Sequence, residues 1–228
     1  MMNYSIKSVK ILFAVLLVIG FASCKKENFE VTPISAISFV NASASSPNLG
    51  VYIGGNKVQT LNNDPFNFGT YYSYSNAYSG EREISFNEGA DKKITGKVTL
   101  VDGMLYSVFL TGKWPQAEIV LLEDKLSVPA TGKANIRFVN MGQDAGTLDL
   151  TNGTTVISSK AYKAASEFIA VDVNAPFNFS IKNSGSADVL VTMPAVSLEM
   201  GRNYTIWAKG LKAGTGADAL GIGIIKNY

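Results

Sequence analysis

The chain has 228 residues, of which 46% are hydrophobic and 17% are charged, and its formal net charge is +2. It contains no histidine, which excludes Ser-His-Asp and Cys-His nucleophilic sites and removes the commonest ligand of transition metals. Its 20 basic and 18 acidic residues form no basic stripe of the kind that binds phosphates, so we expect no nucleic-acid partner.

The N-terminal residues have the layout of a secretory signal. Lys7 and Lys10 precede an uninterrupted apolar run at 11–19, and mostly small residues then lead to Cys24. The run is about half of the roughly 20 residues that a membrane-spanning helix needs, so a permanent transmembrane anchor is the weaker alternative. The sequence therefore predicts a signal peptide over residues 1–23.

The segment FASC at 21–24 resembles the lipobox of bacterial lipoproteins. The resemblance implies that the Cys24 sulfur receives a diacylglycerol and that Cys24 becomes the first residue of the mature chain. Because two or three acyl chains hold a protein stably on a bilayer, residues 24–35 would form a lipidated tether with the membrane as partner. Since Lys25 rather than an aspartate follows the cysteine, we expect outer-membrane residence, on either the periplasmic or the cell-surface face.

Two halves of the mature chain repeat one sequence pattern. The segment ISFVN at 37–41 returns as IRFVN at 136–140, and VTLVDGMLY at 98–106 returns as VSLEMGRNY at 196–204. The offsets, 99 and 98 residues, are nearly constant at the two ends of the unit. A tandem duplication is the simplest explanation.

Short alternating segments indicate strands in both copies. Phe177, Phe179 and Ile181 alternate with polar residues, which is the period of a half-buried strand, and turn residues separate seven or eight such segments per copy. We predict an all-β fold of two tandem immunoglobulin-like β-sandwich domains, with one fused barrel as the alternative. The predicted boundaries are 36–126 for the first β-sandwich, 127–132 for the linker and 133–228 for the second β-sandwich.

Three stretches resemble the tandem, secreted bacterial modules called domain of unknown function 4397. They lie at 39–58, 68–86 and 98–112, and their counterparts lie in the second copy. The resemblance implies a β-sandwich in an extracytoplasmic setting, and it implies no established activity.

Acidic pairs and one glycine-rich segment remain as candidates for chemistry. Glu81 and Glu83 lie two apart on a predicted strand whose inward residue is Ile84, so we expect them to face solvent rather than to form a catalytic pair. The pair at 123–124 is typical of the polar end of a strand. The segment 214–224 is typical of a hairpin loop, because no strand and helix flank it as in a phosphate loop. We predict no catalytic residue, no metal site and no cofactor.

Two residue types recur at equivalent places in the two copies. Asn41 and Asn140 end the repeated strand, where asparagine usually hydrogen-bonds the adjoining turn. Tyr106 and Tyr204 follow a glycine turn, where a buried tyrosine hydroxyl commonly ties a corner. We predict these structural roles rather than ligand contacts.

An aromatic cluster distinguishes the first copy from the second. We predict that Phe68, Tyr72 and Tyr74 pack inward, since Phe68 and Tyr74 align with aromatic residues of the second copy. Tyr71 and Phe66 then remain as exposed aromatic surface, and we predict them as ligand-binding residues because such rings offer apolar faces with polar rims. An ordinary exposed edge strand or an interdomain contact is the alternative.

These observations predict a lipid-anchored cell-envelope protein whose tandem β-sandwich modules act as a non-enzymatic binding, adhesion or structural component. Its partner would be an envelope protein or a glycan. The alternative is a carbohydrate- or peptide-binding accessory lipoprotein of a nutrient-uptake system, and an enzyme is the third hypothesis.

Overall fold

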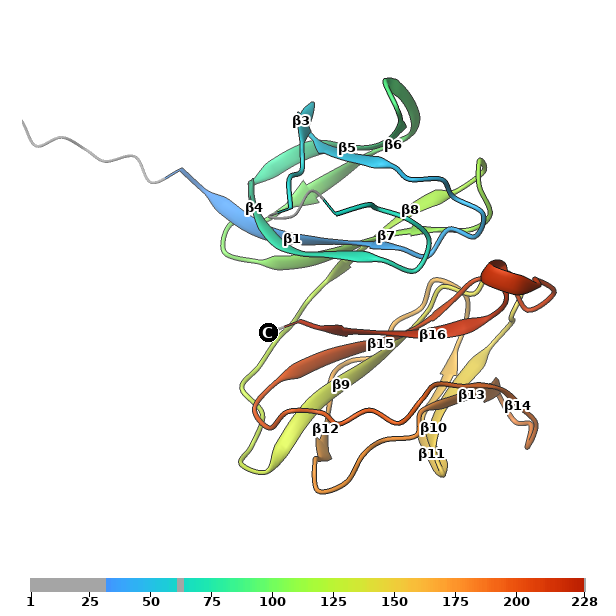
Figure 1. Ribbon diagram of the computed structural model, residues 1–228. Coiled ribbons are helices and arrows are strands. Elements are labelled where there is room, and N and C mark those ends of the chain that lie inside the picture. Colours follow the sequence, from blue (N-terminus) through green and yellow to red (C-terminus); the bar gives the residue numbers. More distant parts are fainter. Residues whose placement is uncertain (1–31, 61–63, 228) are drawn as a thin grey trace, which may run out of the picture. The chain divides into compact units, whose positions relative to one another are not determined.

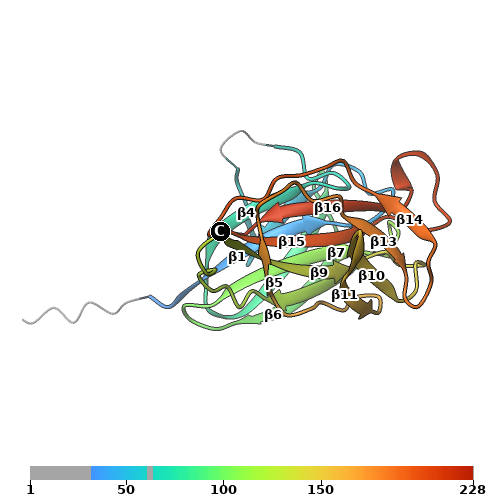
Figure 2. The same cartoon turned by 90° about the horizontal axis from the view of Figure 1, so that it is seen from below.

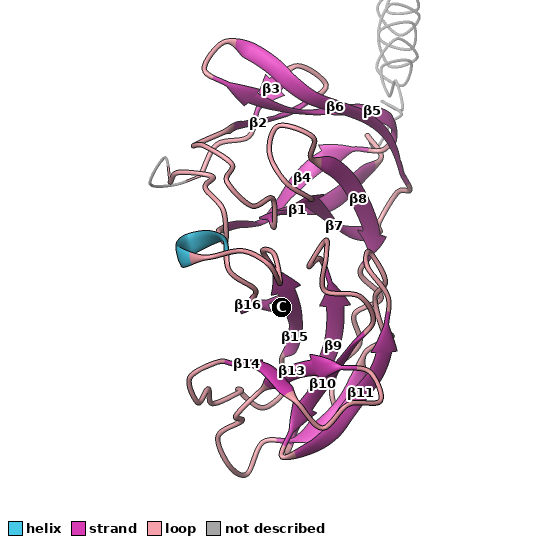
Figure 3. Ribbon diagram, turned by 90° about the vertical axis from the view of Figure 1, so that its right-hand side faces the viewer, coloured by secondary structure: helices cyan, strands magenta, loops and turns pink. Residues whose placement is uncertain are grey.

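The computed structural model describes residues 32–60 and 64–227. The predicted signal peptide, the lipobox and Cys24 lie outside the described residues. Residues Pro33–Tyr228 form one compact unit. Its described part is all-β, as predicted, and consists of strands and one short 3₁₀ helix, η1 (Gly216–Asp218) (Figure 3).

The described residues contain sixteen strands, eight in each half of the unit. Those of the first half are β1 (Ile34–Asn41), β2 (Gly50–Ile53), β3 (Asn56–Lys57), β4 (Tyr71–Tyr78), β5 (Gly80–Glu88), β6 (Asp91–Leu100), β7 (Leu105–Thr111) and β8 (Glu118–Glu123). Those of the second half are β9 (Lys133–Asn140), β10 (Leu148–Asn152), β11 (Thr154–Lys160), β12 (Ile169–Asp172), β13 (Ser180–Asn183), β14 (Val189–Thr192), β15 (Asn203–Lys209) and β16 (Gly221–Lys226). Strand β1 thus begins inside the predicted tether.

Each half contains two four-stranded sheets that face each other (Figures 1 and 2). The strand orders are β4-β1-β7-β8 and β3-β2-β5-β6 in the first half, and β12-β9-β15-β16 and β11-β10-β13-β14 in the second. Over residues 32–60 and 64–227, every hydrogen-bonded strand pair lies within one half. The alternative of one fused barrel is therefore wrong.

The parallel strand pair at the centre of one sheet occurs in both halves. Strand β1 runs parallel to β7 with Phe39 opposite Val108, and β9 runs parallel to β15 with Phe138 opposite Ile206. The other strand pairs are antiparallel. The repeated segments at 37–41 and 136–140 therefore occupy the same position in two sheets.

The alternating apolar residues pack between the two sheets of each half. Phe39, Ile84 and Phe86 are fully buried in the first core, and Phe138 and Phe179 are fully buried in the second. Burying one such side chain stabilises the fold by about 1.5–3 kcal/mol relative to leaving it exposed. One face of each alternating segment thus points into the core of its half, and the other face points to solvent or to the other half.

The recurring tyrosines have the structural role that the sequence predicted. The buried Tyr106 hydroxyl accepts a hydrogen bond from the Val101 amide at 3.2 Å. The buried Tyr204 hydroxyl accepts one from the Glu199 amide at 2.9 Å. Both corners are tied in the same way, five residues upstream of the tyrosine.

The recurring asparagines also have the predicted role. The side-chain amide of Asn41 donates to the Phe66 carbonyl at 3.1 Å, and that of Asn140 donates to the Gly146 carbonyl at 2.8 Å. In each case the Oδ1 atom accepts from the backbone N–H two residues ahead, at 3.1 Å. Both side chains are therefore occupied in fixing the loops that follow β1 and β9.

A third buried cluster lies between the two halves. Its buried members are Val40, Ala42, Phe109, Val139, Met141, Trp207 and Ile225. The rings of Phe109 and Trp207 meet edge to face with their centroids 6.1 Å apart. This cluster, which we call the interhalf core, was not predicted from the sequence.

A buried ion pair also joins the halves. The side chains of Arg137 in β9 and Asp124 just after β8 are 3% and 0% exposed, and they pair through Nη2 and Oδ1. Asp124 Oδ2 accepts hydrogen bonds from Ser107 Oγ at 2.7 Å and from the Tyr74 hydroxyl. Arg137 Nε donates to Thr205 Oγ1 at 2.9 Å. Asp124, predicted as part of a polar strand end, is instead buried because a guanidinium from the other half neutralises it.

Candidate functional site

Strand β4 carries much of the aromatic cluster, and a bulge decides which rings point inward. Its pairing with β1 passes from Phe39 opposite Tyr72 to Ile37 opposite Ser75, so β4 has one extra residue between them. An extra residue interrupts the alternation of faces along a strand. Tyr72 lies in the first core. Tyr74 instead faces the second half, and its hydroxyl accepts a hydrogen bond from the side chain of Asn227 at 3.0 Å. The prediction that Tyr72 and Tyr74 share one face is therefore wrong.

Burial beside a carboxylate also changes the chemistry of Tyr74. Desolvation is the main cause that raises the pKa of the Tyr74 hydroxyl far above its ordinary value, and the nearby Asp124 adds to it. The hydroxyl is thus a neutral hydrogen-bond donor at every physiological pH. Tyr74 contributes to the contact between the halves.

Phe66 is not a surface residue. Its side chain is 0% exposed, its ring stacks on Phe86 with centroids 5.7 Å apart, and its centroid lies 4.9 Å from that of Tyr72. An isolated antiparallel β-bridge pairs the backbones of Phe66 and Leu49, and both side chains lie in the first core. The predicted ligand-binding role of Phe66 is therefore wrong.

Phe68 and Tyr71 lie closer to the surface. Phe68 is only half-buried and does not belong to the first core, so its predicted core position is wrong. The Nζ atom of Lys209 lies 5.4 Å from the Phe68 ring centroid, and burial lowers the pKa of that lysine. Tyr71 is 40% exposed, and its ligand-binding role stays a prediction.

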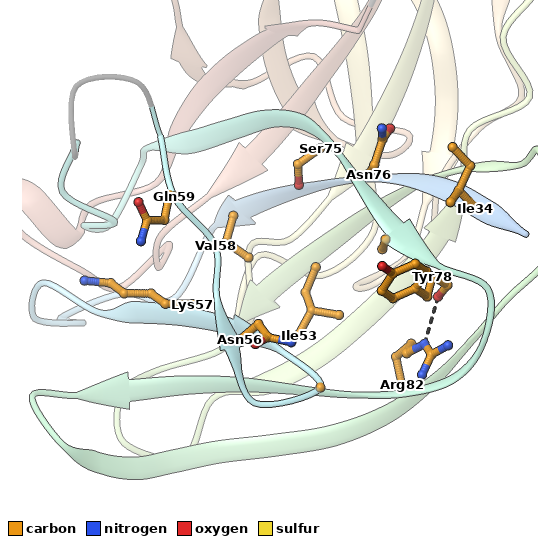
Figure 4. Close-up of a pocket in the computed structure, with 12 residues that line it drawn as sticks. Ile34, Ile53, Asn56, Lys57, Val58, Gln59, Ser75, Asn76, Tyr78 and Arg82 are labelled. Atoms are coloured by element: carbon orange, nitrogen blue, oxygen red, sulfur yellow. Dashed lines mark hydrogen bonds between the residues drawn. The ribbon is translucent and has the colours of Figure 1, made fainter. Parts of the chain in front are cut away.

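A groove opens in the first half where the edges of its two sheets meet. Strand β4 is the edge strand of one sheet, and the two-residue β3 is the edge strand of the other. Because β3 is so short, the two edges leave a cavity of about 570 Å³ between them (Figure 4). Residues from β1 to β5 line this groove, so five strands fix its shape.

The groove has an apolar floor and a polar rim. The half-buried Ile53 and Val58 lie in the groove and pack against the first core. The exposed side chains of Asn56, Gln59 and Asn76 lie around them. Each amide supplies both hydrogen-bond donors and an acceptor, and such a composition suits a polar ligand with apolar faces.

Tyr78 lines the groove beside Arg82, and the residue is 61% exposed. Arg82 Nε donates to the Tyr78 carbonyl at 2.8 Å, and Nη2 donates to the Ser79 carbonyl at 2.7 Å. The guanidinium carbon lies 5.8 Å from the Tyr78 ring centroid, within the range of a cation–π contact. The arginine thus braces the end of β4 while the tyrosine stays accessible.

The sequence did not single out these groove residues. Regular alternation along β4 would place Tyr78 on the same face as Tyr72, and the bulge places it on the other face. The only sequence signal was the segment SNAY at 75–78, in which polar residues flank a ring near a strand end. Asn56 and Gln59 come from a turn segment far away in the sequence, so only the tertiary fold brings them to this groove.

The acidic pair and the glycine-rich segment behave as predicted. Glu81 and Glu83 are exposed and form ion pairs with Lys97 at 2.7 Å and Lys92 at 2.5 Å. The hydrogen bond to Glu81 is the main cause that raises the pKa of Lys97. The segment 214–224 lies in the connection between the antiparallel strands β15 and β16, and it continues into β16.

In residues 32–60 and 64–227, no group of three or more His, Cys, Asp or Glu side chains is placed to hold a metal ion. In that same part of the chain, no helix is long and apolar enough to cross a membrane.

Sheets that pack face to face in pairs, with a groove at the open edge of one pair, define an all-β protein of the β-sandwich type. The chain belongs to the family described as Domain of unknown function (DUF4397), which matches residues 35–151. The matched segment runs from β1 into β10, so it covers the first half and the first two strands of the second. The family membership predicted from the sequence is therefore confirmed.

No curated protein matches the chain. The chain is similar to a solved structure, the crystal structure of CBMbc (family CBM26) from Eubacterium rectale Amy13K in complex with maltoheptaose. The identity is 14%, the similarity covers 86% of this chain and 97% of that chain, and the TM-score is 0.26. A TM-score this low carries no argument about the fold or the ligand of this chain.

Proposed function

We propose that the chain is a lipid-anchored, non-enzymatic binding protein of the bacterial cell envelope that holds its ligand in the groove beside Tyr78. The observation that carries this proposal is an exposed tyrosine, braced by Arg82, next to an apolar floor with amides at the rim. Such a site offers a stacking surface to an apolar face of a ligand and hydrogen bonds to its polar edges. A groove of about 570 Å³ suits a short segment of an extended chain.

We further propose that each half is an immunoglobulin-like β-sandwich domain, with boundaries near 36–126 and 133–228. The same parallel strand pair and the same tyrosine corner occur in both halves and support this assignment. The residues at 127–132 would then be the linker. In this arrangement the groove belongs to the first domain alone.

A carbohydrate- or peptide-binding accessory lipoprotein of a nutrient-uptake system is the second candidate. The three rim amides favour a glycan, because each can both donate to and accept from sugar hydroxyls. A peptide would instead pair with the free backbone edge of β4. Glycan and peptide arrays separate these two ligand classes.

Tyr78→Ala is expected to weaken binding of the ligand found on such an array by about tenfold, because an aromatic contact contributes about 0.5–1.5 kcal/mol beyond its buried area. The exposed position of Tyr78 means that the melting temperature should stay unchanged. Isothermal titration calorimetry on the purified protein measures the dissociation constant, and circular dichroism measures the melting temperature.

Tyr71→Ala is the matched control for this substitution. Tyr71 lies on the same strand and is also exposed, but it does not line the groove. We expect its removal to leave binding in the groove intact. If Tyr71→Ala weakens binding and Tyr78→Ala does not, the ligand binds at the predicted Tyr71 surface and the groove is not the site.

Cys24→Ser is expected to abolish acylation, because the serine hydroxyl cannot replace the thiol that receives the diacylglycerol. The signal peptide should then remain uncleaved by the lipoprotein peptidase. Metabolic labelling with a clickable palmitate, followed by gel fluorescence, measures the acyl chains. Equal labelling of the unsubstituted and the Cys24→Ser proteins would contradict the lipid anchor.

A further inference from the structure

Exposed apolar side chains gather at one end of the folded unit. The structure describes nine large hydrophobic residues that are exposed. Tyr78, which lines the groove, pairs with Ile34 at this end, and five others lie at or beside the strand ends here: Ile34, Val101, Met104, Val128 and Met200. Val128 is the extreme case, because it is 93% exposed. We call these five residues the apolar end. Soluble proteins rarely expose contiguous apolar patches, and such patches commonly mark a contact with a partner or a membrane.

Hydrogen bonds bring the apolar end together from distant parts of the sequence. The Ile34 carbonyl accepts from the Gly103 amide at 2.8 Å, which joins the start of β1 to the turn before β7. The Ser127 carbonyl accepts from the Asn203 side chain at 3.0 Å, which joins the linker to the start of β15. The turn with Met200 is fixed by the Gly201 amide, which donates to the Lys133 carbonyl at 2.8 Å.

A second cavity, of about 650 Å³, lies among these segments. Ile34, Met104 and Val128 line it, and so does Gly201, the neighbour of Met200. One continuous recess therefore touches the start of β1, the turn before β7, the linker and the turn before β15. The side chains of the apolar end thus belong to one surface rather than to scattered positions.

The same end is where the N-terminal segment enters the fold. Strand β1 begins at Ile34, ten positions after Cys24. Even when fully extended, ten residues reach about 35 Å. A lipid on Cys24 would therefore hold the start of β1 within about 35 Å of the bilayer.

The charges at this end largely cancel one another. Lys133 pairs with Asp172 at 2.7 Å, and Lys226 pairs with Glu199 at 2.8 Å. Arg202 lies 3.8 Å from the same Glu199. Contact with a surface would thus depend on apolar insertion more than on attraction to anionic headgroups.

We propose that the apolar end is a membrane-contact surface, in which the side chains at the turn tips insert into the headgroup region of the bilayer that holds the lipid anchor. This inference rests on the proposed anchoring, which sets the end that faces the bilayer. Apolar side chains at an interface are buried to a depth of about 5–10 Å, and their number sets the strength of binding. The contact fixes the orientation of the folded unit, which a flexible tether alone would not do.

The test uses the mature chain with a hexahistidine tag in place of Cys24, bound to vesicles of phosphatidylethanolamine and phosphatidylglycerol that contain a nickel-chelating lipid. The chain has no histidine and no other cysteine, so the tag alone recruits it and an introduced thiol is the only label site. Val128→Cys carrying an environment-sensitive fluorophore reports insertion. Val189→Cys is the matched control, because this exposed valine pairs with Lys182 near the loops that follow β9.

The emission of the label at 128 is expected to rise about threefold or more and to shift to the blue on vesicles, while the label at 189 stays unchanged. The rise should persist at high salt, and Met200→Asp should reduce it by about half or more.

An unchanged signal at 128, or equal signals at both sites, would overturn the proposal. A signal that appears at high protein concentration without vesicles would also overturn it, because a second copy would then cover this surface. Since the tag replaces the lipid, failure here is distinguishable from failure of the palmitate labelling.

Discussion

Arg137→Ala is expected to lower the free energy of unfolding by about 3–5 kcal/mol, because it leaves the Asp124 carboxylate buried without a counter-charge. The Asp124 side chain is 0% exposed, so solvent screens its charge only weakly. Its remaining partners, the hydroxyls of Ser107 and Tyr74, are neutral. Urea unfolding followed by circular dichroism measures the loss.

Two further variants show whether this loss comes from the unpaired charge. Removing both charges with Asp124→Leu and Arg137→Met is expected to recover most of the stability, because no buried charge remains. Lys97→Ala removes one partner of an exposed ion pair and should leave the unfolding midpoint unchanged. If Arg137→Ala unfolds at the same urea concentration as Lys97→Ala, the buried pair does not stabilise the contact between the halves.

Trp207→Ala is expected to lower the free energy of unfolding by about 3–5 kcal/mol, because it empties the centre of the interhalf core. The Trp207 side chain is fully buried, and it meets Phe109 of the first half edge to face. A Cβ atom added at Gly223 would clash with the Trp207 ring, which shows how closely the backbone of β16 approaches it. Differential scanning calorimetry measures the change.

The same experiment tests whether the interhalf core couples the two halves. Because Trp207 belongs to the second half and contacts the first, we expect one cooperative transition that shifts as a whole. Trp207→Phe is the milder control, since the indole Nε1 has no hydrogen-bond partner among the described residues. Two transitions, of which Trp207→Ala shifts only one, would show that the halves unfold independently.

The sequence predicted those features that depend on local pattern. Alternation and turn residues predicted an all-β chain, and the duplication predicted equal roles for Tyr106 and Tyr204 and for Asn41 and Asn140. Each tyrosine hydroxyl accepts from a backbone amide five residues away, and each asparagine oxygen accepts from the backbone N–H two residues ahead. These short-range contacts recur in both halves, whereas the amide of Asn41 donates to Phe66, 25 residues away, and that of Asn140 donates to Gly146, 6 residues away.

The bulge in β4 is the feature that alternation could not predict. One extra residue between Tyr72 and Ser75 moves Tyr74 to the other face. A period of two assigns faces only as long as the pairing register is regular. The error at Tyr74 follows from this single residue.

The contact between the halves was hidden for a different reason. Ser38 and Arg137 occupy the same place in the repeated segments ISFVN and IRFVN, and both are buried. A buried arginine needs a carboxylate, but nothing local indicates that Asp124, on the other side of the linker, provides it. The difference at this repeated position was the one available sign that the outer face of β9 is covered.

The position of β1 has a mechanical consequence. The N-terminal segment leads directly into β1, and β1 lies inside its sheet with β4 on one side and β7 on the other. Under the proposed lipid anchoring, a pull on a partner held by the folded unit would load the chain along the axis of β1. The hydrogen bonds on both sides of the strand lie across that axis, so they bear the load together in shear rather than opening one after another. A tether attached at this strand can therefore resist pulling forces that would peel a terminal edge strand from a sheet.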